Sequence, residues 1–151
     1  MKKLIGCLII VLSVFLLTGC ETGKNKNNSF QKMSFDELKG IKKVKEDSGK
    51  LDTGEKWQSV RYVTDDMVLS IFCYEDRDMS KGISLRQDLK DKKINNINYK
   101  YSQMKVKEDR LFDQYYTQVG KDTYHISVTY EKNDQTKEKL DNFLKSITIK
   151  K

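Results

Sequence analysis

The chain has 151 residues and a formal net charge of +7. This length suits one small domain, and we expect no second one. The basic residues are spread over every segment among 22 acidic ones, which argues against a nucleic-acid-binding surface. The excess positive charge is better suited to anionic lipid headgroups or acidic wall polymers.

The first twenty residues read as an export signal. Lys2 and Lys3 precede fourteen mostly apolar, uncharged residues, Leu4 to Leu17. This run is too short to cross a bilayer, which takes about 20 residues. It ends in Leu17-Thr18-Gly19-Cys20, which resembles the lipobox of bacterial lipoproteins. The alternative is a plain N-terminal anchor or an ordinary secretory signal, in which Cys20 is incidental.

The resemblance implies that residues 1–19 are a cleaved type II signal peptide and that Cys20 carries a diacylglyceryl group. Two acyl chains hold a protein stably on a bilayer, whereas one chain holds it only marginally. We therefore expect a lipid-anchored protein on the outer face of the cytoplasmic membrane. Residues 20–32, mostly polar, should form a flexible tether, and residues 33–151 one globular domain. The chain lacks Ala and Pro and is rich in Lys, Asn and Ile, which favours an AT-rich, Gram-positive source.

In the first half of the domain the sequence predicts a helix, a strand and a hairpin. Ser34 and Glu37 form a capping-box pattern for a short helix that ends near Gly40. Between residues 40 and 55, sparse apolar residues predict a weak edge strand. Residues 57–64 and 67–74 are β-branched and aromatic, so they predict a hairpin whose second strand is central.

In the second half, a further capping-box pattern at Ser84 predicts an amphipathic helix over residues 85–93, ended by Asn95-Asn96. Alternating apolar residues then predict strands at 97–102, 111–119 and 123–131. A last helix begins at Asn133 or Asp134 and is followed by a short closing strand. Its apolar face consists of Leu140, Phe143, Leu144 and Ile147.

This order of elements predicts an α+β fold, a mainly antiparallel sheet packed by two or three helices. It lacks the regular alternation of strands and helices that a parallel sheet requires. The arrangement is similar to the PsbP and Mog1 type of sandwich found in small lipoproteins.

Residues suited to catalysis or metal binding are few. His125, the only histidine, lacks the companion ligands that zinc needs, so we expect a solvent-side strand histidine. Asp76 and Asp78 lie in EDRDMSKG, which lacks the glutamate of a calcium loop. Carboxylates such as Asp76, Glu108 and Asp113 could still form a hydrolase pair, because such acids can come from distant positions. No phosphate-binding glycine motif occurs.

The cysteines and tyrosines favour structural roles. Cys73 has no disulfide partner once Cys20 is lipidated, and its apolar surroundings predict a buried side chain. The C-terminal strands are rich in tyrosine, which suits either a Tyr and Lys face that binds a protein or a carbohydrate, or the filling of a core without alanine. We favour the core, which would be filled by half of the following six residues: Tyr99, Tyr101, Tyr115, Tyr116, Tyr124 and Tyr130.

Together these patterns predict a non-enzymatic, membrane-anchored binding or accessory module with no cofactor and no bound metal. Its partner would be an envelope protein or a wall polymer. Two alternatives remain open: an immunity or exclusion lipoprotein against a toxin or phage, and an envelope hydrolase.

Overall fold

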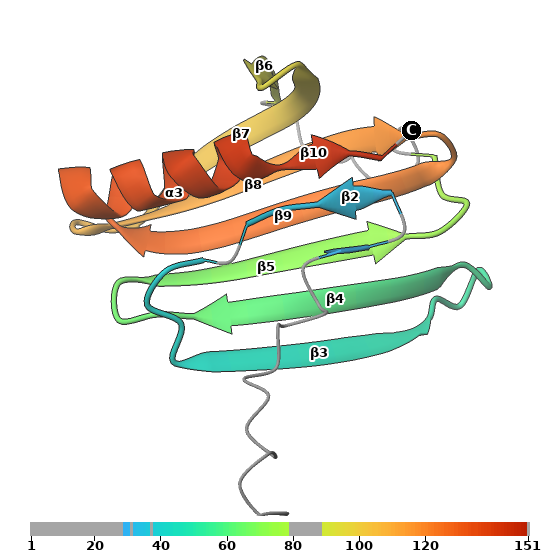
Figure 1. The fold of residues 1–151 in the computed structure, drawn as a ribbon, viewed down its shortest axis with the longest axis horizontal. Coiled ribbons are helices and arrows are strands. Elements are labelled where there is room, and N and C mark those ends of the chain that lie inside the picture. The colour runs from blue at the N-terminus through green and yellow to red at the C-terminus, as the bar shows by residue number, and fades with distance from the viewer. Residues whose placement is uncertain (1–28, 31, 37, 79–88, 151) are drawn as a thin grey trace, which may run out of the picture.

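The computed structural model describes residues 29–30, 32–36, 38–78 and 89–150. Seven strands form one antiparallel sheet in the order β3-β4-β5-β9-β8-β7-β6 (Figure 1). Their bounds are β3 Lys43–Lys50, β4 Lys56–Val63, β5 Met67–Tyr74, β6 Lys90–Ile94, β7 Ile97–Lys107, β8 Arg110–Val119 and β9 Asp122–Glu131.

A second layer covers one face of this sheet. It consists of the helix α3 (Asp134–Ser146) and a small antiparallel sheet of β1 (Ser29–Phe30), β2 (Met33–Ser34) and β10 (Thr148–Ile149). Figure 1 shows α3, β2 and β10 in front of the large sheet. We call the sheet face beneath them the covered face and the opposite one the second face.

The core lies between the covered face and α3. Ile71 and Ile126 are Cα partners at the centre of the sheet, and both are fully buried. From the helix, Leu140 and Leu144 are each 1% exposed. Burying one such side chain contributes about 1.5–3 kcal/mol. The alternation of apolar and polar residues in these strands therefore decides which sheet face α3 covers.

The predicted α+β fold with two or three helices is wrong. The described residues form a mainly β structure in which α3 is the single helix. The difference arises at two segments, residues 34–40 and 85–93, whose capping patterns predict helices.

The predicted helix from Ser34 to near Gly40 is absent from the residues of this segment that the structure describes. Ser34 belongs to β2, and its hydroxyl lies 2.8 Å from that of Thr148 in β10. Met33 and Phe35, on alternate positions, are both buried. Only a few residues separate Ser34 from Gly40, which has φ +76°. A helix that short is unstable by itself, because nucleation is costly, whereas strand pairing satisfies the same backbone groups.

The predicted helix over residues 85–93 is also wrong where the structure describes it. Residues 90–94 form β6, which pairs with β7, and residues 85–88, like the capping pattern at 84–87, lie outside the described part. Asn95 and Asn96 have φ values of +46° and +65°. Two consecutive residues with positive φ make a tight hairpin turn, and asparagine tolerates that backbone well. Asn95-Asn96 therefore connect two strands and do not end a helix.

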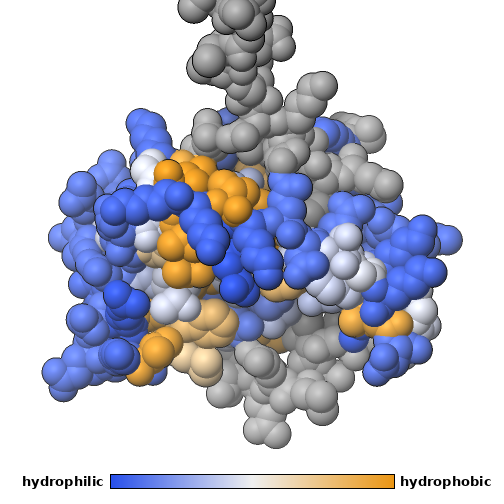
Figure 2. Space-filling model, turned by 90° about the horizontal axis from the view of Figure 1, so that it is seen from below, coloured by the Kyte–Doolittle hydropathy of each residue, from blue (hydrophilic) through white to orange (hydrophobic). Residues whose placement is uncertain are grey.

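Other predictions are confirmed. Strands β4 and β5 form the expected hairpin, β5 lies inside the sheet, and β3 is an edge strand. Asn133 caps α3, accepting a 2.8 Å hydrogen bond from the backbone N–H of Thr136. The side chains of β3 are mostly exposed and charged, which protects this edge against pairing with another sheet. Seen from that edge, hydrophilic residues dominate the surface and hydrophobic residues gather in patches (Figure 2).

A partly buried ion pair attaches α3 to the β4–β5 turn. The Asp66 carboxylate accepts hydrogen bonds from Lys139 Nζ at 2.8 Å and from the hydroxyls of Thr64 at 2.6 Å and Thr136 at 2.9 Å. Burial by itself would raise the pKa of Asp66, but these hydrogen bonds outweigh it and hold the pKa well below its usual range. The ionised carboxylate therefore stabilises the docked helix.

The N-terminal segment meets the sheet at one end, where β9 begins. Lys32 Nζ lies 2.9 Å from Asp122, and the Lys32 backbone N–H donates to the Tyr124 hydroxyl at 3.3 Å. The Lys150 backbone N–H donates to the Lys32 carbonyl at 2.8 Å. Strand β1 lies just before Lys32, within residues 20–32. Both ends of the described chain are therefore held close to the start of β9.

Candidate functional site

An apolar row crosses the second face at one end of the sheet. Val63, Val68, Thr129, Phe112 and Met104 are successive Cα partners on β4, β5, β9, β8 and β7. Val68 is 39% exposed and Met104 is 52% exposed, while Val63 and Phe112 are half-buried. Exposed apolar side chains gathered in one place mark interaction sites more often than scattered ones do.

Val106 lies two residues after Met104, at an irregularity in the register of β7 between Lys105 and Lys107, and it is also 52% exposed. We call Val63, Val68, Met104, Val106 and Phe112 the apolar patch. The patch lies at the opposite end of the sheet from Lys32. On β9, Thr129 in the row lies seven positions after Asp122, which binds Lys32, a span of about 23 Å at the rise of an extended strand.

Cationic side chains border the patch on the β3 side. Lys43 is the Cα partner of Val63 and continues the row onto the edge strand, and its side chain is exposed. Arg61, also exposed, lies two residues before Val63 and so on the same face, where its Nε donates to the Ser70 hydroxyl at 3.1 Å. The surface thus combines an apolar centre with positive charge at its border.

His125 lies on the second face, as its strand position predicts, but it is packed between aromatic rings. Its ring stacks on Tyr116 with centroids 4.3 Å apart and on Phe72 at 5.7 Å. The Gln114 side-chain nitrogen lies 3.2 Å from His125 Nε2. The histidine is therefore half-buried within a cross-strand stack on the face that α3 does not cover.

The acidic residues named as a candidate hydrolase set do not come together. Asp76 follows β5, and its backbone N–H donates to Asp122 at 3.1 Å, at the end of the sheet near Lys32. Glu108 lies in the β7–β8 turn at the opposite end, and Asp113 is buried within β8. Among the described residues, no three His, Cys, Asp or Glu side chains converge as they would in a metal site, and this includes Asp76 and Asp78.

Asp113 is instead the centre of a buried polar cluster on the covered face. It is 2% exposed and accepts hydrogen bonds from the hydroxyls of Tyr115 at 3.0 Å, Tyr101 at 3.2 Å and Tyr130 at 3.2 Å. The Gln103 amide donates to it at 2.8 Å. Burial, and then the nearby Asp113 carboxylate, raise the pKa of all three tyrosines above the ordinary value. This cluster has the features of a stabilising network.

The core interpretation of the tyrosines is largely confirmed, since Tyr99, Tyr115, Tyr124 and Tyr130 are buried. Cys73 is buried too, and this burial raises the pKa of its thiol to about 11, so the reactive thiolate is suppressed at neutral pH. Cys20, the predicted lipidation site, lies outside the described residues.

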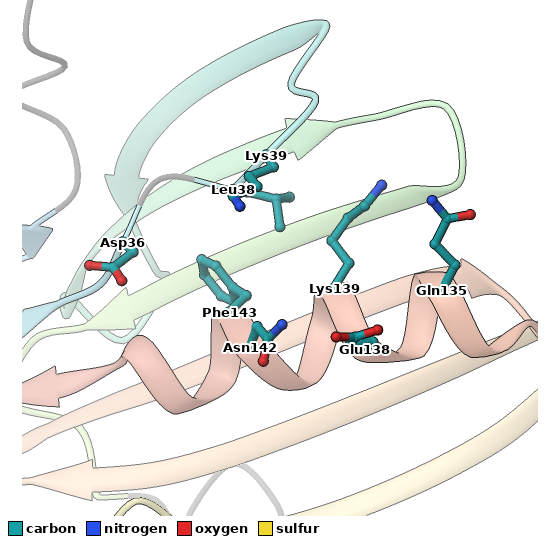
Figure 3. A pocket seen from close by; sticks show the side chains of 8 residues that line it. All are labelled: Asp36, Leu38, Lys39, Gln135, Glu138, Lys139, Asn142 and Phe143. Atoms are coloured by element: carbon teal, nitrogen blue, oxygen red, sulfur yellow. The ribbon is translucent and has the colours of Figure 1, made fainter.

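Two grooves flank α3. The first has a volume of about 310 Å³ and lies between the helix and the segment around Leu38 (Figure 3). Leu38 and Phe143 supply its apolar part, and its charges balance, with two lysines, Lys39 and Lys139, and two acids, Asp36 and Glu138. The second groove, of about 360 Å³, lies between α3 and β6 and is lined mainly by lysines.

The apolar patch and both grooves were missed from the sequence. The patch has a weak signal there, because Met104 and Val106 alternate with lysines at the end of a long strand. The strand order was needed to place them beside Phe112 and Val68. For the grooves no signal exists, since each depends on where α3 lies on the sheet.

The chain matches no family model and no curated protein. A crystal structure of a protein from Bacteroides thetaiotaomicron is similar to it, with a TM-score of 0.55 and 12% sequence identity. The likeness covers 79% of this chain and 45% of the other, so this chain spans less than half the length of that protein. At this identity the similarity concerns the fold alone. Within the described residues, no helix is long and apolar enough to cross a membrane.

Proposed function

We propose that this protein is a lipid-anchored, extracytoplasmic binding module that acts without catalysis and holds another envelope protein through the apolar patch. The anchor is the diacylglyceryl group on Cys20, which the lipobox resemblance implies. The membrane is the first partner, through this lipid, and the protein bound at the patch is the second.

The position of the apolar patch carries this proposal. The first described strand, β1, pairs with β2 and leads into Lys32, and the patch lies about 23 Å further along β9 from the residue that binds Lys32. A domain tethered through β1 can present the patch away from the membrane. This layout supports a tethered binder, because the anchored end and the contact end do not compete for space.

The chemistry of the patch favours a protein partner with apolar and acidic side chains. Met104 and Val68 offer contact area that a wall polysaccharide cannot bury well, and Lys43 and Arg61 at the border favour carboxylates. Protein interfaces combine an apolar centre with a polar rim in the same way.

Site-specific photocrosslinking in living cells tests this proposal. A benzophenone amino acid placed at Val68 or Met104 should capture the same single envelope protein. The same probe at Val44 is the matched control, because Val44 is 40% exposed but lies on the edge strand outside the patch. The variants M104E and V106E should each reduce capture from Val68 about tenfold, since a few central side chains carry most of the affinity of an interface.

Capture of the same proteins from Val44 would contradict the proposal. Capture of cytoplasmic proteins alone, or unchanged capture in the M104E and V106E variants, would contradict it as well.

A further inference from the structure

The groove between α3 and β6 has a fixed shape and a strongly unequal charge. It is lined by Lys92, Lys93, Lys137 and Lys145, with Asp141 as the one carboxylate and Asn95 at its end. We call it the basic groove. The Asn95 side-chain amide donates to the Lys145 carbonyl at 2.8 Å, which joins the β6–β7 turn to the end of α3. The two walls are thereby held at one spacing.

The positive charge of the basic groove is not neutralised by the described residues. Lys93, Lys137 and Lys145 are exposed, and none of them forms an ion pair with any part of the chain that the structure describes. Five lysines elsewhere in the described part of the chain pair with a carboxylate: Lys32, Lys42, Lys45, Lys100 and Lys139. Lysines without an ion pair occur there too, such as Lys50 and Lys121, so the groove is distinguished by the gathering of four lysines around one site. Four ammonium groups around one carboxylate leave a local excess of about three charges.

Lys92 is held in place by aromatic rings and not by an acid. Its ammonium group lies 4.3 Å from the ring centroid of Tyr101 and 5.2 Å from that of Tyr115. A cation–π contact fixes the position of the cation but does not cancel its charge. Lys92 can therefore attract an anion without first giving up an ion pair.

The C-terminus of a helix normally repels anions, because its last carbonyl groups carry partial negative charge. In the basic groove, Asn95 donates at 2.8 Å to one of these carbonyls, that of Lys145, and at 3.5 Å to the carbonyl of Ile147, the cap residue that follows the helix. The lysines and not the carbonyl oxygens therefore dominate the potential. The other groove along α3 differs, since its two lysines face two acids and Lys139 is already bound to Asp66.

From this arrangement we propose that the basic groove binds a phosphodiester anion, of the kind found in anionic phospholipid headgroups and in glycerol phosphate polymers. Several lysine ammonium groups around one concave site can donate hydrogen bonds to the charged, non-bridging oxygens of a phosphodiester. The site is separate from the apolar patch, and its occupancy does not depend on the protein partner proposed above.

Lysine acetylation followed by mass spectrometry tests the proposal on the protein isolated from its host. The protein is placed in phosphatidylcholine nanodiscs, and two arms are compared with this reference. One arm adds phosphatidylglycerol to the nanodiscs, and the other adds a soluble glycerol phosphate polymer. We expect at least one arm to slow acetylation of Lys93, Lys137 and Lys145 by about tenfold, and excess salt to remove the protection. The arm that protects identifies the source of the phosphodiester.

Exposed lysines away from the groove are the internal control. Lys50, Lys56 and Lys121 should react at the same rate in all arms. Substituting Lys93, Lys137 and Lys145 together with Gln should weaken binding of the protecting ligand about 100-fold, at about fivefold per lysine. The same three substitutions at Lys50, Lys56 and Lys121 remove equal charge and should leave binding within about twofold.

Protection in neither arm would overturn the proposal. Equal protection of the groove and control lysines would also overturn it, because that result indicates diffuse attraction to a cationic protein.

Discussion

Replacing Asp113 by Ala is expected to lower the free energy of unfolding by about 3–5 kcal/mol. The carboxylate is 2% exposed and accepts hydrogen bonds from three tyrosine hydroxyls and one amide. Its removal leaves buried donors without an acceptor and opens a cavity beside them. Urea unfolding at pH 7 measures the loss.

Asp109 in the β7–β8 turn provides the matched control for Asp113. Its side chain is exposed, so D109A should change the unfolding midpoint little. The tyrosines add a dependence on high pH. Because the folded-state pKa of Tyr101, Tyr115 and Tyr130 is raised, their contribution is complete below the unfolded pKa of about 10 and declines as pH rises above it. A D113A variant as stable as wild type would refute the role of the cluster.

Replacing Asp66 by Ala is expected to cost about 2–4 kcal/mol, because Lys139 would keep a partly buried charge without its partner. The effect should depend on pH. The folded pKa of Asp66 is lowered, so its contribution is complete above the unfolded pKa of about 4 and declines as pH falls below it. In D66N, this decline between about pH 5 and pH 2 should be absent. Urea unfolding at pH 7, 5 and 3 gives both results.

The adjacent Asp65 is the control for Asp66. It pairs with Lys42, but both side chains are largely exposed, so D65N should leave the midpoint nearly unchanged at each pH. If D66N lost stability on acidification as steeply as wild type, the prediction would be wrong, and another carboxylate would cause the loss of stability at low pH.

The elements predicted correctly from the sequence combine a clear period with unambiguous ends. The helix α3 has an asparagine cap and an apolar face at helical spacing, and the β4–β5 hairpin has two β-branched runs around Asp65-Asp66. The errors have a different origin. Ser34 and Ser84 begin patterns that also suit a helix, and only tertiary pairing decides that Ser34 joins a strand. Lys90–Ile94 is likewise a strand because it pairs with β7. The sequence pattern failed there because two consecutive asparagines are typical both of a helix end and of the tight turn that they form in the structure.

The candidate sites could not be predicted for a related reason. Whether Met104 faces the core or solvent depends on the register of β7 and on which face α3 covers. The same holds for Asp113, whose neighbours in sequence, Phe112 and Gln114, gave no sign that three tyrosines from three strands would surround it. In both cases the site is formed by residues that are distant in the chain, and local sequence patterns do not predict such long-range contacts.

The intact mass of the protein recovered from host membranes, wild type beside C20S, tests the lipid anchor most directly. We predict a wild-type mass equal to residues 20–151 plus a diacylglyceryl group, and loss of both the modification and the cleavage after Gly19 in C20S. An unmodified mature chain released into the medium would contradict the anchor and, with it, the tethered binding module.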